Sequence, residues 1–146
     1  KVEDHEKQEK SEIPVGSLKG KRVLLCEDNA MNREIASAVL KMRGIEVTET
    51  INGRQGLKEF VSSAPGRYDA VLMDVQMPVM NGYEASRRIC TSRRPFGKTI
   101  PIIALTANAF AEDIVRSSEA GMDAHITKPI DENKLKECML RLLASR

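Results

Sequence analysis

Five short apolar stretches, each followed by a longer stretch with helical periodicity, limit what this chain can fold into. They read RVLLC (22–26), IEVTET (45–50), DAVLM (69–73), PIIAL (101–105) and AHIT (124–127). Most are apolar throughout, which is typical of strands buried on both faces of a parallel sheet. Strands that alternate with helices predict an α/β fold with helices on both faces of the sheet and right-handed crossovers.

The stretches between the strands carry helix signals at residues 32–44, 53–63, 82–92, 109–121 and 131–145. In the first, Ile35, Val39 and Met42 recur at helical spacing and Gly44 is a stop signal. The last has apolar residues at i, i+3, i+4, i+7 and i+8, which predicts one buried face. These residues are Leu135, Cys138, Met139, Leu142 and Leu143.

The helix predicted at 109–121 differs from the others because it is poor in apolar residues. We expect Ile114 and Val115 to be its main anchors. Small buried area means low local stability, so this helix is the part of the domain that we expect to move.

The chain of 146 residues suits one domain. Residues 1–19 are dense in charge, contain no aromatic residue and have little to bury, so we expect a flexible linker or tail before a domain at 20–146. The chain does not begin with Met. We therefore expect that it was either processed or cut from a longer protein.

Composition excludes several classes of function. The net charge is only +2, and no block of like charge is long enough for a nucleic-acid footprint, so no nucleic acid is expected as a partner. No apolar run approaches the roughly 18 residues of a membrane span, so no membrane contact is expected. Three scattered cysteines without CxxC spacing argue against disulfides and for a reducing, cytoplasmic setting.

Polar residues follow the predicted strands where each one ends. Glu27 and Asp28 follow the first strand, Asp74 ends the third, Thr106 ends the fourth and Lys128 follows the fifth. Because the carboxyl ends of parallel strands lie at one edge of the sheet, these groups should converge in one shallow site.

The chemistry of this group favours a divalent cation and a phosphoryl group. Three close carboxylates repel one another, and Mg²⁺ prefers hard oxygen ligands together with water and phosphate. A metal and a lysine around Asp74 would stabilise a phosphoryl group, so Asp74 could act as a nucleophile and form an aspartyl phosphate.

Each residue also has a simpler explanation. Asp28 and Asn29 could cap the first helix, and Thr106 could cap a later one. Asp74 could be a turn residue, and Lys128 could lie in a solvated loop. It is much less expected that all of these simpler explanations hold together, each at the end of a different strand, than that any one of them holds alone.

The motifs VLLCEDNAMNREIA, DAVLMDVQMPVMNGYEA, PIIALTANA and AGMDAHITKPI resemble the receiver domain of two-component response regulators. The resemblance covers roughly residues 20–145 and has four motifs in the right order. It implies a flavodoxin-like, doubly wound, five-stranded parallel sheet of order 2-1-3-4-5 with five helices.

The resemblance also implies roles. Asp74 matches the phosphoacceptor, Asp28 a direct Mg²⁺ ligand and Glu27 its acidic neighbour. Gln76 matches the position that offers its backbone carbonyl to the metal. The receiver would catalyse its own aspartyl phosphorylation and dephosphorylation, with a phospho-histidine of a kinase or phosphotransfer protein as donor.

Other matches concern the conformational switch. Thr106 matches the hydroxyl that moves onto the phosphoryl oxygen, and Lys128 the ammonium that pairs with it. Pro129 matches a proline that often follows a cis bond, and Ala107 a small residue beside the acceptor. His125 stands where the family usually has Tyr or Phe, as the switch residue.

The pattern Asp-Asn-x-x-Asn-Arg most resembles receivers at the carboxyl end of hybrid sensor histidine kinases, whose parent chain could be membrane-anchored. A stand-alone response regulator is the alternative. A third possibility is a phosphatase with an aspartate nucleophile, but that class needs a second Asp where this chain has Gln76. A flavin or dinucleotide binder would need a Gly- or Ser/Thr-rich loop where this chain has CEDNAMN, and an inactive receiver should lack the acceptor, the lysine or the acid pair.

Overall fold

The computed structural model describes residues 18–64, 66–77, 79–91, 100–107, 111–128 and 130–144, with the side chains of 111–113 and 144 left out. Its five strands are β1 (Arg22–Cys26), β2 (Glu46–Thr50), β3 (Ala70–Asp74), β4 (Ile102–Thr106) and β5 (Ala124–Thr127). They form one parallel sheet of order β2-β1-β3-β4-β5, as predicted. β1, β3 and β4 are central, which is why they are the most apolar strands.

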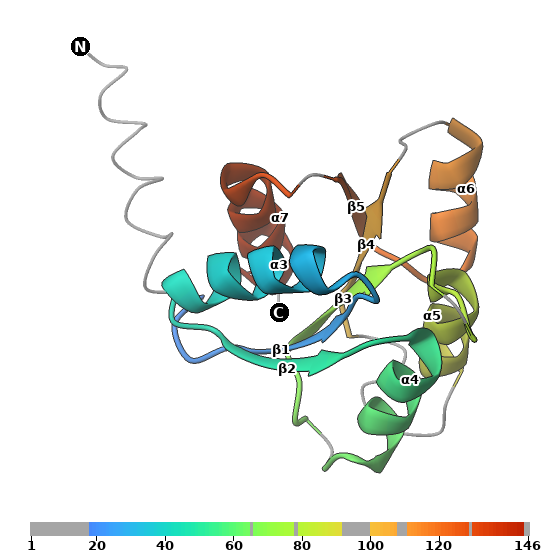
Figure 1. Cartoon of the computed structure of the whole chain (residues 1–146), viewed down its shortest axis with the longest axis horizontal. Coiled ribbons are helices and arrows are strands. Elements are labelled where there is room, and N and C mark those ends of the chain that lie inside the picture. Colours follow the sequence, from blue (N-terminus) through green and yellow to red (C-terminus); the bar gives the residue numbers. More distant parts are fainter. Residues whose placement is uncertain are drawn as a thin grey trace.

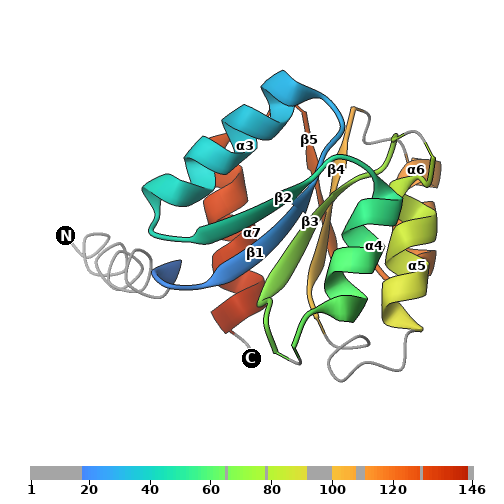
Figure 2. The same ribbon diagram turned by 60° about the horizontal axis from the view of Figure 1, so that its bottom comes forward.

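Each strand is followed by one helix, and the helices cover both faces of the sheet (Figures 1 and 2). They are α3 (Ala30–Met42), α4 (Gly53–Ser62), α5 (Gly82–Cys90), α6 (Ala111–Glu119) and α7 (Glu132–Ala144). Figure 2 shows α3 and α7 on one side of the sheet and α4, α5 and α6 on the other. This arrangement leaves the two ends of the strands as the places where loops gather.

Alternation along the strands divides the apolar side chains between two cores. Leu24, Val71 and Ile102 point toward α4 and α5, where they pack with Phe60 and Ile89. Their neighbours on the strands point toward α3 and α7. Those neighbours are Val23, Leu25, Leu72, Ile103 and Leu105, and they pack with Leu40, Leu135 and Met139. Both faces of the central strands are therefore buried, as the continuous apolar runs predict.

A glycine sets how closely α4 approaches β1. A Cβ atom at Gly56 would lie 2.4 Å from Sγ of Cys26, which is too close for any real contact. Cys26 is fully buried beneath this helix turn. The side chain of Thr50 closes the same region, where its hydroxyl donates to the carbonyl of Leu25 at 3.2 Å.

Two expectations about the helices are wrong. On α3, Ile35 and Met42 are 43% and 70% exposed, and the buried residues are Ala36, Ser37 and Leu40. The inner face of α3 is therefore made of Leu40 and two small residues, while Ile35 and Met42 face solvent.

On α6, Ile114 and Val115 are 39% and 53% exposed, so they are not its anchors. Among the described side chains of this region, Ser117 and Ala120 are buried instead. The guanidinium of Arg116 lies 4.3 Å from the ring centre of Tyr83 on α5. The movement expected of α6 stays a prediction.

The boundary between the charged segment and the domain also stays a prediction, because residues 1–17 lie outside the described residues. Leu18, at the start of the described chain, is buried in the core formed with α3 and α7. A helix with the length and apolar character needed to span a bilayer is absent from the described part of the chain.

Candidate functional site

Backbone hydrogen bonds tie together the loops at the carboxyl edge of the sheet. The amide of Glu27 donates to the carbonyl of Thr50 at 3.1 Å, and the amide of Val75 donates to Leu105 at 3.1 Å. The amide of Lys128 donates to the carbonyl of Thr106 at 2.7 Å. These bonds join the carboxyl ends of neighbouring strands: β1 to β2, β3 to β4, and β5 to β4.

Three carboxylates meet at this edge. Glu27, Asp28 and Asp74 each place one oxygen within 4.8 Å of the others. Glu27 and Asp74 are buried, whereas Asp28 is exposed at the mouth of the site. The sequence prediction that the first and third strands bring these acids together is therefore confirmed.

Lys128 lies between two of these acids. Its Nζ atom is 3.1 Å from Oδ1 of Asp74 and 3.3 Å from Oε1 of Glu27. The Lys128 side chain is only 21% exposed. Lys128 is thus part of the site and not a solvated loop residue.

Burial and Lys128 have opposite effects on the pKa of Asp74, the acid at the end of β3. Burial raises the pKa of Asp74 to about 7, the negative charge of Glu27 adds to the rise, and Lys128 works against it. Burial alone would lower the pKa of Lys128, but its hydrogen bond to Asp74 and the charges of both acids outweigh burial and raise it. Without another cation, the charged form of Asp74 is therefore disfavoured.

The donor set of this site fits a hard divalent cation. Oδ2 of Asp74 and Oε1 of Glu27 are buried, and neither accepts a hydrogen bond from any described residue. Three carboxylates at this spacing, one of them open to water, match the preference of Mg²⁺ for a few carboxylate oxygens completed by water. Glu27, Asp28 and Asp74 are the residues that would hold the ion.

Asp28 is not the cap of the first helix. Asn29 takes that place, since its side chain accepts from the amide of Asn32 at 2.9 Å. The amide of Asn29 also donates to Oε2 of Glu27 at 3.2 Å, which fixes that acid from the helix side. Of the two residues that could cap α3, one does so and the other faces the acid cluster.

Of the remaining predicted residues, the structure places Thr106 and Gln76 at the same edge. Thr106 is buried at the end of β4, opposite Thr127 in register. Gln76 is exposed, and its amide donates to Oδ1 of Asp74 at 3.2 Å. His125 is half-buried in β5 and lines a groove of about 230 Å³ between β5 and α7. Pro129 lies outside the described residues.

Two features near the site were missed by sequence reasoning. Val79, in the loop after β3, has a φ of 72° and is 72% exposed. A β-branched residue rarely adopts this conformation, and no sequence pattern marks it. Arg33 on α3 donates from Nη1 to the backbone carbonyl of Glu27 at 2.9 Å. Arg33 is the last residue of the Asp-Asn-x-x-Asn-Arg pattern, but the pattern does not reveal that its partner is a backbone carbonyl.

Acids and a lysine at the carboxyl edge of a doubly wound parallel sheet define an α/β protein whose chemistry takes place at that edge. The family model for the response regulator receiver domain matches residues 23–140. Over 130 residues the chain is 39% identical to the hybrid signal transduction histidine kinase L of Dictyostelium discoideum, covering 88% of this chain and 8% of that protein. Over 116 residues it is 43% identical to the two-component response regulator ORR41 of Oryza sativa subsp. japonica, covering 78% of this chain and 87% of that protein.

Solved structures agree. The chain is similar to the receiver domain of the sensor histidine kinase PA1611 from Pseudomonas aeruginosa PAO1, with a TM-score of 0.77 and 37% identity. The match covers 86% of this chain and 98% of that one. That structure has a magnesium ion coordinated in its active site cleft. The chain therefore belongs to the response regulator receiver domain family of two-component signalling and has its flavodoxin-like fold. It spans only 7–18% of the length of the histidine kinases it matches.

The raised pKa of Asp74 predicts how stability depends on pH in the metal-free protein. The folded state keeps the proton up to a pKa of about 7, whereas the ordinary pKa of an aspartate is 3.8. Between these values the folded state binds more protons, so the free energy of unfolding should fall as pH rises from about 4 to about 7. We expect a loss of about 2 kcal/mol, roughly half of what a fully dry site would give at about 1.4 kcal/mol per pKa unit.

The measurement is urea unfolding at several pH values between 5 and 8, with a metal chelator present. Asp74→Asn is the comparison, because it removes this titration and keeps the shape of the side chain. The variant should be the more stable protein at pH 8, and the difference should shrink toward pH 5. Parallel pH profiles for the two proteins would contradict the prediction.

Proposed function

We propose that this receiver domain accepts a phosphoryl group from a phospho-histidine onto Asp74, in a site that holds Mg²⁺. The observation that carries the proposal is the position of Lys128, 3.1 Å from Asp74 and 3.3 Å from Glu27, beside a cluster of three acids. A carboxylate flanked by an ammonium and by oxygen ligands for a cation is arranged to bind a phosphoryl group.

The transfer needs Asp74 in its ionised form. A carboxylate oxygen forms a bond to phosphorus while the bond from phosphorus to the imidazole nitrogen breaks, and its electron pair stays on that nitrogen. When bound, Mg²⁺ supplies positive charge to the acids and to the phosphoryl oxygens. Lys128 then pairs with a phosphoryl oxygen, and Thr106 on the neighbouring strand can reach another.

A phosphatase with an aspartate nucleophile is the competing function. It would need an acid two residues after the nucleophile, and this chain has the exposed Gln76 there. Incubation with acetyl phosphate and Mg²⁺, followed by intact mass, separates the two functions. We expect one phosphate per chain, stable to acid, labile to base and released slowly. Continuous turnover of acetyl phosphate without a phosphorylated chain would favour the phosphatase.

The partner is a phospho-histidine protein, and we place its docking surface at the amino end of α3. Met31 and Ile35 are 68% and 43% exposed on α3. Ile51 and Val79, which follow β2 and β3, are 47% and 72% exposed. These four residues form the docking patch of this proposal. Met80 is partly buried against the core, and Pro78 lies outside the described residues, so neither belongs to the docking patch.

Placing a charge in the docking patch should slow transfer from a protein donor and leave acetyl phosphate labelling unchanged. We expect Met31→Asp to reduce the transfer rate about tenfold, because a central apolar contact is typically worth more than 1 kcal/mol. Met42→Asp is the matched control. Met42 is equally exposed at 70%, but it lies eleven residues along the helix, or about 16 Å from Met31. Equal loss in both variants would place the docking surface elsewhere.

The likeness to hybrid kinases also supports a parent chain with a histidine kinase core and a cytoplasmic location for this domain. The stand-alone alternative has its own support, since the two-component response regulator ORR41 is matched over 87% of its length. Reading the coding sequence upstream of Lys1 separates the two origins. A kinase core with a phosphorylatable histidine is the result that we expect.

A further inference from the structure

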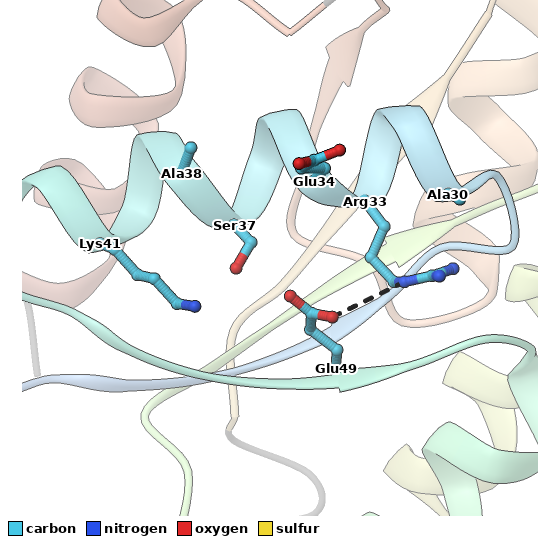
Figure 3. Close-up of a pocket in the computed structure, with 7 residues that line it drawn as sticks. All are labelled: Ala30, Arg33, Glu34, Ser37, Ala38, Lys41 and Glu49. Carbon is cyan, nitrogen blue, oxygen red and sulfur yellow. Dashed lines mark ion pairs between the residues drawn. The ribbon is translucent and has the colours of Figure 1, made fainter.

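Arg33 joins three parts of the molecule. It belongs to α3, its Nη1 donates to the backbone carbonyl of Glu27 at 2.9 Å, and its Nε lies 3.7 Å from Oε1 of Glu49 on β2. Figure 3 shows the side chain extending from α3 toward Glu49 across the space between the helix and the strand. One guanidinium therefore links the loop that carries two of the three acids to the neighbouring strand.

The carbonyl of Glu27 is a sensitive place for such a contact. It belongs to the peptide that connects Glu27 to Asp28, so its orientation helps to set where both side chains point. The amide of Glu27 is already held by Thr50 at 3.1 Å, and its Oε2 accepts from Asn29 at 3.2 Å. Arg33 adds a charge-assisted hydrogen bond on the carbonyl side of the same residue.

Arg33 borders a groove, so packing alone does not fix its position. The groove holds about 430 Å³ and is lined by Ala30, Arg33, Glu34, Ser37, Ala38, Lys41 and Glu49. The two alanines leave it open along α3. Arg33 itself is only 20% exposed, and Glu49 is 41% exposed. The direction of the guanidinium therefore depends on its two polar partners, Glu49 and the carbonyl of Glu27.

We propose that Arg33 is a positioning residue for the metal site and that Glu49 holds Arg33 in place. Arg33 does not touch the ion. It orients the peptide between Glu27 and Asp28 so that both carboxylates face Asp74. This inference rests on the proposed metal site and adds a contact that lies outside it.

The simpler explanation is that Arg33 and Glu49 form an ordinary surface ion pair. Such pairs contribute little to stability and would leave metal binding untouched. The two explanations predict different Mg²⁺ affinities for a variant that keeps the positive charge at position 33 but loses the planar guanidinium. Arg33→Lys makes that change, because an ammonium cannot reproduce the fork that reaches two partners at once.

The experiment is a Mg²⁺ titration of the whole chain followed by the amide NMR signals of residues 27–29. Loss of a residue that orients metal ligands typically weakens binding 10–100-fold, so we expect Arg33→Lys to weaken Mg²⁺ binding by about tenfold. Lys41→Arg is the matched control, since it makes the reverse exchange in the same groove without touching the loop. It should bind Mg²⁺ like the wild type.

Glu49→Gln tests the second half of the proposal, with Glu34→Gln as its control. Both remove one negative charge from the same groove, but only Glu49 pairs with Arg33 among the described residues. We expect Glu49→Gln to weaken Mg²⁺ binding several-fold. The double variant Arg33→Lys/Glu49→Gln should bind Mg²⁺ no more weakly than Arg33→Lys alone. Independent, multiplying effects would mean that Glu49 does not act through Arg33.

The amide signals of the metal-free proteins give a separate readout. Arg33→Lys should shift the amides of Asp28 and Asn29 and speed their hydrogen exchange, while the rest of the spectrum stays folded. Wild-type affinity and unshifted amides in Arg33→Lys would overturn the inference. If the wild type itself shows no saturable Mg²⁺ binding, the proposed function fails, and the metal-free amides still decide whether Arg33 positions the loop.

Discussion

Phosphoryl labelling of this chain is expected to disappear when Asp74 is replaced by asparagine. The amide has no ionised oxygen to attack phosphorus, so neither acetyl phosphate nor a phospho-histidine protein should label Asp74→Asn. The fold should persist, because asparagine has the same shape as aspartate. Its amide oxygen can take the place of the carboxylate oxygen that contacts Lys128 and the amide of Gln76. The measurement is intact mass after incubation with each donor.

Asp28→Asn is the control for a general loss of negative charge at this edge. It removes one charge from the same cluster of acids. It should weaken Mg²⁺ binding and slow the labelling, but the label should still reach Asp74. Labelling of Asp74→Asn at the wild-type rate would move the acceptor to another residue. Complete loss of labelling in both variants would mean that Asp28 is as necessary as Asp74, so labelling alone would not identify the acceptor.

Replacing Gly82 with alanine is expected to cause the largest loss of stability among single-methyl changes near the site. A Cβ atom at Gly82 would lie 2.2 Å from the carbonyl oxygen of Asp74 and 2.8 Å from Cα of Val75. Both are backbone atoms at the end of β3, so the start of α5 must move away from the strand. We expect the free energy of unfolding to fall by about 3 kcal/mol, the upper part of the usual range for overpacking.

The control is Gly20→Ala. A Cβ atom there meets nothing within 4 Å, but the backbone has a φ of 83°. That variant should lose only about 1 kcal/mol, from the cost of a left-handed conformation. Urea unfolding of both proteins makes the comparison. Similar losses would mean that the loop after Asp74 relaxes easily, and that the close approach of α5 to β3 has little cost.

The sheet and its reactive edge could be predicted because both depend on local patterns. Continuous apolar runs predicted that β1, β3 and β4 are buried strands, and the resemblance to the family supplied the order of the sheet. Parallel strands end at the same edge, so Asp28, Asp74 and Lys128 could be placed together before any coordinates. The sequence alone did not reveal that Asp74 is buried while Asp28 is exposed.

Which side of each helix faces the sheet could not be predicted as well. Ile35 and Met42 have the spacing of core residues, yet the inner face of α3 is made of Ala36, Ser37 and Leu40. Apolar character does not determine burial, because a large part of every protein surface is apolar. The contact between Arg33 and the carbonyl of Glu27 was invisible for another reason. Backbone carbonyls leave no mark in a sequence.

The close approach of Gly56 to Cys26 means that labelling of Cys26 can report how often α4 separates from β1. Cys26 is fully buried, and burial raises the pKa of its thiol to about 12. Only the thiolate reacts with alkylating reagents, so the native state should be silent. With Cys90 and Cys138 replaced by alanine, each iodoacetamide molecule that reaches Cys26 would record one separation of α4 from β1. The labelling rate would then measure how often the sheet beside the acceptor comes apart, with no foreign probe in the protein.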